Sequence, residues 1–452
     1  MRKLFENAVV LKYATTLTIL SVLLLPKFPL IRVPGTFVSI RIEDLAVFVT
    51  TVLFAYHFFG DRKEIWNYRV TKYSLIYISA GLVSLVSAVF LTRTTLPHIG
   101  FLHLLRRIEY LIPLFVGIYL VRANKANLEY FIKIFMIVIL YAFIYGIGQR
   151  YFNWPIVITQ NLEYSKGVAL RWIEGSHINS TFAGHYDLAA YLVLVLPVVV
   201  GVFSYTKTMK SKISFGITIF GGLWLLGFAA SRISIVAYLV AVVFALILSK
   251  RYKLIPIIVL ISVLIFGLSP NLRARYDRFF SVLKDRVSVV VDDELGVYAT
   301  QIIPNKREQA TPTPTPIPVF EDRSTSIRLK AAWPKAFRAI EKNPLLGTGY
   351  SSVTLAVDNN YLRILGEVGI IGFAGWLLLF LGIIRSFVDV FPFTKELKGV
   401  DVGYVSSVAA AIVGVLLIAL FIDIYLASKF AIIYWFVIGM ALGVIRNSGK
   451  EI

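Results

Sequence analysis

Residues 358–373 read DNNYLRILGEVGIIGF, and within this stretch a polar segment runs directly into an apolar helix. Asp358 and Asn359 are good N-cap residues, because their side-chain oxygens accept hydrogen bonds from the unpaired amides of a first helical turn. Asn359, Arg363 and Glu367 recur at helical spacing and would share one face. The stretch predicts a helix that enters a membrane, with its polar start at the membrane–water boundary. These polar residues either only cap and hold the helix or carry chemistry there.

The composition of the whole chain agrees with a membrane protein. Its 452 residues are 58% hydrophobic and 16% charged, and the mean hydropathy is +0.76, which excludes an ordinary soluble domain. Segments of about 20 apolar residues cross a bilayer as helices, since lipid offers backbone groups no other partner. We therefore predict an all-α polytopic membrane protein with about twelve transmembrane helices, at residues 8–25, 44–59, 70–91, 108–121, 128–148, 186–204, 213–230, 232–249, 254–269, 361–384, 404–426 and 429–445.

The charge and the cysteine count exclude several classes of function. The chain has no cysteine, so disulfide frameworks, thiol nucleophiles and cysteine-ligated metals are excluded. The net charge of +20 comes from basic residues scattered over the ends of the spans, not from one basic face. An anionic bilayer surface and an anionic, lipid-linked substrate are the partners expected, and no nucleic acid, cofactor or metal is.

The short loops predict the orientation in the membrane. Of the Lys and Arg residues near span ends, 19 fall on the side that carries both termini and 11 on the other. By the positive-inside rule both termini are cytoplasmic. The first apolar run is interpreted as a retained span, because no small-residue cleavage site follows it before Pro26.

This orientation divides the chain into three parts. Residues 1–269 would hold spans 1–9, residues 270–358 a long external loop, and residues 359–452 spans 10–12. The Pro/Thr-rich run at 311–318 (TPTPTPIP) predicts an extended spacer without chemistry. Residues 324–342 have apolar side chains at helical spacing and predict an amphipathic helix on the membrane surface, which Pro334 would kink or restart.

Three arginines on the predicted external side are candidates for binding phosphate. Arg232 stands between two apolar runs with almost no loop to solvate it, and a guanidinium at that depth needs a partner. It would either reach the surface, pair with a carboxylate such as Asp423, or bind phosphate with its planar fork of donors. Arg171 and Arg328 lie on the same predicted side and would join it there.

Further polar residues lie near the entrance of the span at 186–204. His177, His185 and Asp187 could contact a substrate, as could Arg363, but their spacing matches no common metal-ligand pattern. Asp187 would also suit the first turn of a helix, where a carboxylate faces the positive end of the helix dipole. The glycines that recur every three residues, at 366, 369, 372 and 375, predict close helix packing.

At these residues the chain resembles the bacterial O-antigen ligases and O-antigen polymerases. The ligase pattern is His, then Asn, Ser or Gln, nine residues, Gly, two residues, and Gly, Thr or Tyr. Three residues of this chain fall on it, and Asp358 replaces the His. The segment 328–349 is similar to the family's Arg-Trp-Pro-Leu-Gly-x-Gly segment, and residues 231–232 resemble its Ser-Arg-Gly turn with Ile233 in place of Gly. The matching residues are Asn359, Gly369, Gly372, Arg328, Trp333, Pro344, Leu345, Gly347, Gly349, Ser231 and Arg232.

The resemblance implies a glycosyltransferase in the bacterial cytoplasmic (inner) membrane, acting at the external leaflet. A sugar hydroxyl of an acceptor glycan would displace the lipid diphosphate of a polyprenyl-diphosphate-linked oligosaccharide. Arg232, Arg171 and Arg328 would bind the diphosphate, and Asp358, Asn359 and Glu367 would be the catalytic residues. Arginines beside Asp358 are expected to lower the pKa of its carboxyl. In this family an Asp at that position points to a polysaccharide polymerase.

Two alternatives stay open. One is a ligase that transfers the glycan onto lipid A core or onto protein. The other is a transporter or flippase for a lipid-linked sugar, which would use the same arginines. Transporters often have matching halves with broken spans. The long loop lies in one half of this chain only, which favours the enzyme.

Overall fold

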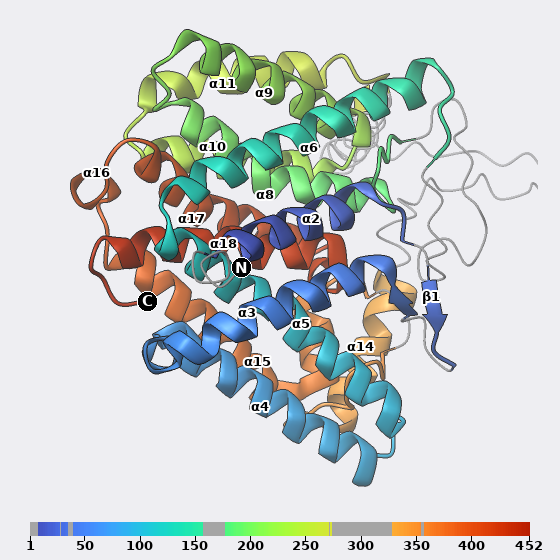
Figure 1. Ribbon diagram of the computed structural model, residues 1–452. Coiled ribbons are helices and arrows are strands. Elements are labelled where there is room, and N and C mark those ends of the chain that lie inside the picture. Colours follow the sequence, from blue (N-terminus) through green and yellow to red (C-terminus); the bar gives the residue numbers. More distant parts are fainter. Residues whose placement is uncertain are drawn as a thin grey trace, which may run out of the picture.

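The protein is a bundle of long helices packed side by side (Figure 1). The structure, a computed structural model, describes residues 8–27, 29–34, 39–156, 177–270, 272–273, 328–353 and 357–452. The long helices are α2 (Val9–Leu24), α3 (Ile42–Asn67), α4 (Arg69–Phe90), α5 (Pro97–Ala123), α6 (Ala126–Tyr151), α8 (His185–Phe203), α9 (Met209–Ala229), α10 (Arg232–Leu248), α11 (Ile255–Phe266), α15 (Asn360–Val388), α17 (Val400–Ile418) and α18 (Ser428–Asn447).

Each of the twelve predicted spans overlaps one of these helices, which confirms an all-α polytopic membrane protein. Within the described residues, eight helices are both long and apolar enough to cross a bilayer, and α2, α10 and α11 are apolar but shorter. The exact number of spans therefore stays a prediction. The helix α18 is buried over its full apolar window and forms the centre of the bundle, against which α5 packs closely.

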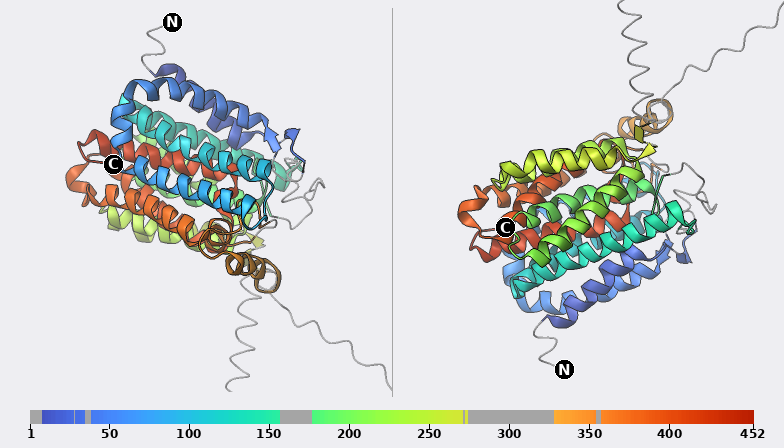
Figure 2. Two further views of the ribbon diagram at one scale, coloured as in Figure 1. Left: turned by 90° about the horizontal axis from the view of Figure 1, so that it is seen from below. Right: turned by 90° about the horizontal axis from the view of Figure 1, so that it is seen from above.

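Consecutive helices alternate in direction, so the bundle has two distinct ends. Tertiary hydrogen bonds identify one of them: the Lys429 ammonium donates to the carbonyl oxygens of Leu23 and Thr181, and the Asn360 amide donates to that of Ala419. We call this the polar end; α8, α10, α15 and α18 begin there and α2 and α17 end there. The chain leaves α18 at the opposite end, as Figures 1 and 2 show.

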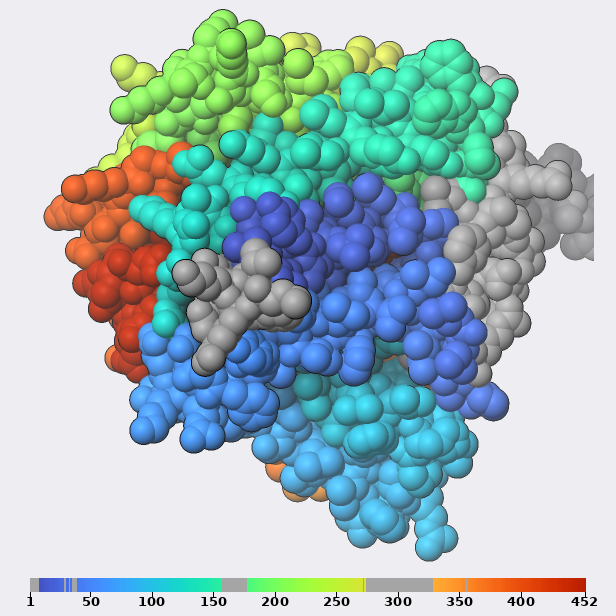
Figure 3. All heavy atoms as spheres, in the orientation of Figure 1, coloured from blue at the N-terminus to red at the C-terminus, as the bar shows by residue number. Residues whose placement is uncertain are grey.

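Short elements connect the long helices at both ends of the bundle. A two-stranded antiparallel ribbon, β1 (Pro29–Arg32) and β2 (Ser39–Arg41), joins α2 to α3 at the polar end. Near the other end lies the short helix α16 (Phe393–Glu396). On the face shown in Figure 3, α2 lies beside α3 and α6.

The predicted amphipathic helix is present as α14 (Trp333–Lys342), preceded by one π-helical turn, Arg328–Ala332. Pro334 stands in the first turn, where its missing amide costs nothing, so it marks a new helix start. In α14 the side chain of Ala336 is buried and that of Phe337 is exposed. Leu329, in the preceding π-helical turn, is exposed as well. The face predicted to be apolar is therefore only partly used inside the protein.

A break divides α15 at Gly369, whose φ of 66° is outside helical values. The loop at 344–349 pairs with this break: the amide of Ile370 donates to the carbonyl of Pro344 and that of Gly349 to the carbonyl of Glu367. A β-carbon on Gly369 would lie 2.4 Å from the carbonyl carbon of Leu345. The glycines at 366, 369, 372 and 375 were predicted to allow close helix packing. This is confirmed for Gly375, which packs against the backbone of α4. Gly369 has a different role, because its positive φ makes the backbone turn.

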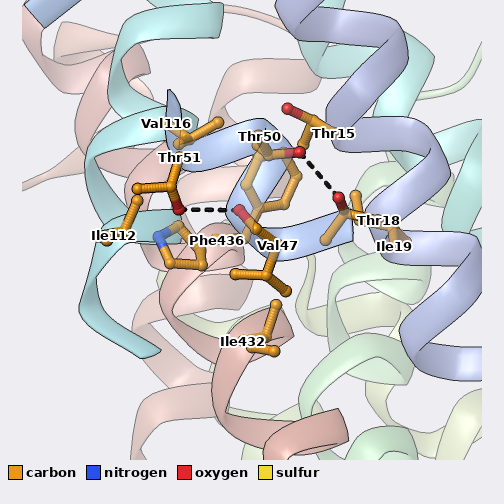
Figure 4. Close-up of a pocket in the computed structure, with 11 residues that line it drawn as sticks. Thr15, Thr18, Ile19, Val47, Thr50, Thr51, Ile112, Val116, Ile432 and Phe436 are labelled. Atoms are coloured by element: carbon orange, nitrogen blue, oxygen red, sulfur yellow. Dashed lines mark hydrogen bonds between the residues drawn. The ribbon is translucent and has the colours of Figure 1, made fainter. Parts of the chain in front are cut away.

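An apolar pocket lies between α2, α3, α5 and α18 (Figure 4). Its threonines bond within the protein: Thr18 pairs with Thr50 at 2.8 Å, and the Thr51 hydroxyl donates to the Val47 carbonyl. No charged side chain lines it. The pocket therefore has no cation that could bind an anionic group.

Candidate active site

The carboxylate of Asp423 organises the polar end. It follows α17 and accepts hydrogen bonds from three consecutive backbone amides, those of Val357 at 2.7 Å, Asp358 at 3.2 Å and Asn359 at 3.2 Å. Asn359 is the N-cap of α15, and its side-chain oxygen accepts from the amide of Leu362. Capping was predicted for both Asp358 and Asn359; the structure gives this role to Asn359, which leaves the Asp358 side chain available.

A buried ion network lies directly beneath this start of α15. Arg363 donates to Asp423 at 3.0 Å and to Glu367 at 3.1 Å, and Glu367 lies 3.7 Å from Arg107 of α5. Two arginines therefore balance two carboxylates. Asp423, which was an alternative partner for Arg232, is instead the partner of Arg363. Glu367 and Arg363 are 3% and 5% exposed and bond to each other, so the network joins α15 to α5 and to the segment after α17.

Asp358 differs from these carboxylates in being accessible. Its side chain is 39% exposed and lies 3.4 Å from Nε of Arg328, whose guanidinium also donates to the Phe421 carbonyl. Burial raises the pKa of the Asp358 carboxyl, and Arg328 lowers it only in part. The neighbouring arginines lower this pKa as predicted, but desolvation by burial is the larger effect and makes the net shift upward.

Arg232 begins α10, after a tight turn in which Ala230 has a left-handed backbone and Ser231 is the N-cap. The predicted turn between two spans is thus present. The carbonyl of Ala237 packs on Gly414, so α10 runs along α17 and the start of α10 lies near the end of α17. The Phe421 carbonyl that binds Arg328 follows the same end of α17. Arg232 and Arg328 therefore both stand at the polar end.

The residues around α8 form a separate group. Asp187 stands in the first turn of α8, as predicted, and its carboxylate lies 3.8 Å from the ammonium of Lys27. The rings of His177 and His185 contact each other with centroids 4.6 Å apart. Arg171 and the spacer at 311–318 lie outside the described residues, so their predicted roles stay predictions.

Several residues at the polar end were given no site role from the sequence, although a signal was present. They are Arg107, Lys429 and Glu43. All three are charged residues at the ends of apolar segments, where a charge is costly and needs a partner. The sequence does not show which residue each of these charges contacts.

These features define a polytopic α-helical membrane protein that gathers buried ion pairs and one accessible Asp–Arg pair at one end of its bundle. Residues 217–377 match the family model described as O-antigen ligase. It contains Arg232, Arg328, Asp358 and Arg363. No curated protein matches the chain significantly. The family supports a membrane glycosyltransferase of the O-antigen ligase or polymerase type, with a lipid-linked glycan as substrate, in the bacterial inner membrane.

The ion network predicts that Asp423→Asn destabilises the protein strongly. Asparagine leaves Arg363 without its full counter-charge, and removing one partner of a buried pair typically costs about 3–5 kcal/mol. We expect a large fall in the thermal unfolding midpoint of the purified protein. Asp389→Asn is the matched control, since Asp389 is 32% exposed and pairs with Arg69; its loss should cost about 1 kcal/mol or less. Equal midpoints for the two variants would contradict a supporting role for Asp423.

Proposed function

We propose that this protein transfers a glycan from a polyprenyl diphosphate donor to the sugar hydroxyl of an acceptor glycan, as a surface polysaccharide polymerase. The observation that carries the proposal is the accessible Asp358–Arg328 pair, held beside the buried ion network. It combines a carboxylate that can accept a proton with a cation that can face a leaving phosphate. The transfer is assigned to the external face of the inner membrane.

The donor diphosphate would bind between Arg232 and Arg328. A guanidinium fork bonds two phosphate oxygens at once, and the start of α10 adds backbone amides and the positive end of a helix dipole. The hydroxyl of the N-cap Ser231 pairs with the hydroxyl of Ser234 and accepts no hydrogen bond from a backbone amide of this first turn. These amides are therefore not occupied by a side-chain cap.

In the reaction, the acceptor hydroxyl oxygen forms a bond to the anomeric carbon while the bond from that carbon to the diphosphate oxygen breaks. The leaving diphosphate takes the electron pair of that bond, and the two arginines stabilise its charge. Asp358 accepts the hydroxyl proton. A carboxylate whose pKa is raised by burial is a better base than an ordinary aspartate, which supports this role.

Asn359 and Glu367, also predicted to be catalytic, are proposed here to act through Asp358. Asn359 caps α15 next to it, and Glu367 fixes Arg363, which in turn orients Asp423. Asp423 binds the Asp358 amide. Both residues would then be positioning residues.

The break in α15 favours a second candidate, the transporter, because transporters coordinate substrates at broken helices. Such breaks usually come in matching pairs. Among the described helices, only α15 has a non-helical residue inside it. A single break with an Asp–Arg pair beside it fits the transferase better.

The proposed orientation predicts which positions an impermeant reagent reaches. In this naturally cysteine-free chain, single cysteines at Arg328 and Lys330 should label in intact spheroplasts, because both precede α14 at the polar end. Cysteines at Lys395 and Lys450, at the other end, should label only after the cells are opened. The reverse pattern would place the polar end in the cytoplasm and rule out an external reaction.

The donor site predicts that Arg232→Lys lowers turnover more than stability. Lysine keeps the charge but loses the planar fork, and a charge-assisted hydrogen bond is worth about 1.5–3 kcal/mol, or roughly 10- to 100-fold in rate. Transfer from the lipid-linked donor is measured with the purified protein. Arg385→Lys, at an exposed position in the last turn of α15, is the control. Full activity in the Arg232→Lys variant would remove Arg232 from the phosphate site.

The base role predicts a large effect of Asp358→Asn. Asparagine keeps the shape, while general-base catalysis is typically worth about 10²- to 10⁴-fold. We expect that loss in kcat with an unchanged unfolding midpoint, and partial activity in Asp358→His. The wild-type rate should fall as pH drops through the raised pKa of Asp358, because only the carboxylate accepts a proton, and this dependence should vanish in the Asn variant. Near-normal turnover by the Asn variant would leave Asp358 as a merely structural residue.

A further inference from the structure

We propose that a second buried polar cluster at the polar end is the binding site for the hydroxyl groups of the acceptor glycan. This Glu43 cluster consists of Glu43, Asp187, Lys27, Arg41 and Lys429. The inference rests on the proposed function and adds to it the place of the acceptor.

The cluster is buried and comes from four different elements. Glu43 is in the first turn of α3, Asp187 in that of α8 and Lys429 in that of α18, while Lys27 follows α2. The exposed fractions of these four side chains are 2%, 4%, 1% and 2%. Arg41 lies 3.7 Å from Glu43. Lys429 is within electrostatic range of both carboxylates.

The cations of the cluster already have partners in the protein. The three donors of Lys429 meet the carbonyl oxygens of Leu23, Leu25 and Thr181, at 3.3, 2.9 and 2.9 Å. Arg41 donates to the hydroxyl of Ser428 at 3.1 Å.

The carboxylates have cations nearby, Arg41 at 3.7 Å from Glu43 and Lys27 at 3.8 Å from Asp187, but these distances are too long for hydrogen bonds. Within the part of the chain that the structure describes, neither oxygen of Glu43 and not Oδ2 of Asp187 accepts a hydrogen bond, although all three atoms are buried. A buried acceptor without a donor destabilises the protein, and more so when it is charged. The cluster therefore has open acceptor positions that a bound molecule with donor groups would fill.

The charges select the class of that molecule. The open positions are acceptors, which an ionised phosphate oxygen without a proton cannot fill, and the three cations of the cluster would repel a metal ion or an amine. A neutral molecule rich in hydroxyl groups satisfies both conditions, since each hydroxyl donates one hydrogen bond and accepts others. A glycan is such a molecule.

The position of the cluster suits an acceptor whose reactive end reaches Asp358. The segment from Asp423 to Lys429 connects the two sites, because Asp423 binds the amide of Asp358 and Lys429 belongs to the Glu43 cluster. Six residues span at most about 20 Å. An oligosaccharide bound at Glu43 could therefore extend to the Asp358–Arg328 pair.

Direct binding of the free glycan tests the proposal without requiring catalysis. The probe is the repeat-unit oligosaccharide released from the lipid-linked donor, titrated calorimetrically into the protein in nanodiscs. We expect Glu43→Gln, which keeps the volume and replaces one acceptor oxygen by a donor, to weaken binding by about tenfold or more. Glu129→Gln, at an exposed position in the first turn of α6, is the control and should bind as the wild type does.

Two further measurements keep the result interpretable. Asp187→Asn should weaken glycan binding in the same way, and this variant tests the acceptor site if Glu43→Gln does not fold. In transfer assays Glu43→Gln should raise KM for the acceptor and leave KM for the lipid-linked donor unchanged. Wild-type affinity in both variants, or no binding by the wild-type protein, would overturn the acceptor site.

The test also separates this proposal from the proposed function. Asp358→Asn should bind the oligosaccharide normally while failing to transfer it. If Glu43-dependent binding were found but no transfer occurred with any donor, the transferase function would fall and the glycan site would stand.

Discussion

The buried pairing of Arg363 with Asp423 and Glu367 is the interaction on which the polar end depends. A guanidinium that is 5% exposed is tolerated only with compensating charges, and both carboxylates lie within 3.1 Å of it. Asp423 then has oxygens left for three consecutive amides. One carboxylate thus joins the start of α15 to the segment after α17, and this fixes the backbone that presents Asp358.

Burial separates the acidic residues of this end into two roles. Glu367 and Asp423 are fully enclosed and bonded, so they stabilise the arrangement. Asp358 is next to them in space but accessible, with one arginine partner at 3.4 Å. The same side-chain chemistry therefore supports the structure at one position and is available to a substrate at another, because solvent access differs.

The break in α15 explains why glycine is required at residues 347 and 369. Gly347 and Gly369 both have positive φ, and a β-carbon on either would lie within 2.5 Å of the other segment's backbone. The loop at 344–349 can therefore take the hydrogen bonds that the interrupted helix leaves open. This pairing places α14, which follows Arg328, against the part of α15 that precedes the break at Gly369.

The sequence alone determined the features that depend on local spacing. Apolar runs of span length gave the helices, the four-residue interval gave the Arg363–Glu367 pair, and Ser231–Arg232 between two runs gave the turn that starts α10. The tertiary structure alone decided which charges meet across long separations. Arg363 and Asp423 are 60 residues apart, and Lys429 reaches a carbonyl 406 residues away. It also decided that Asp358 is partly desolvated and that Glu43 is buried with open acceptor positions, because burial depends on every element that packs around a residue and no local pattern records it.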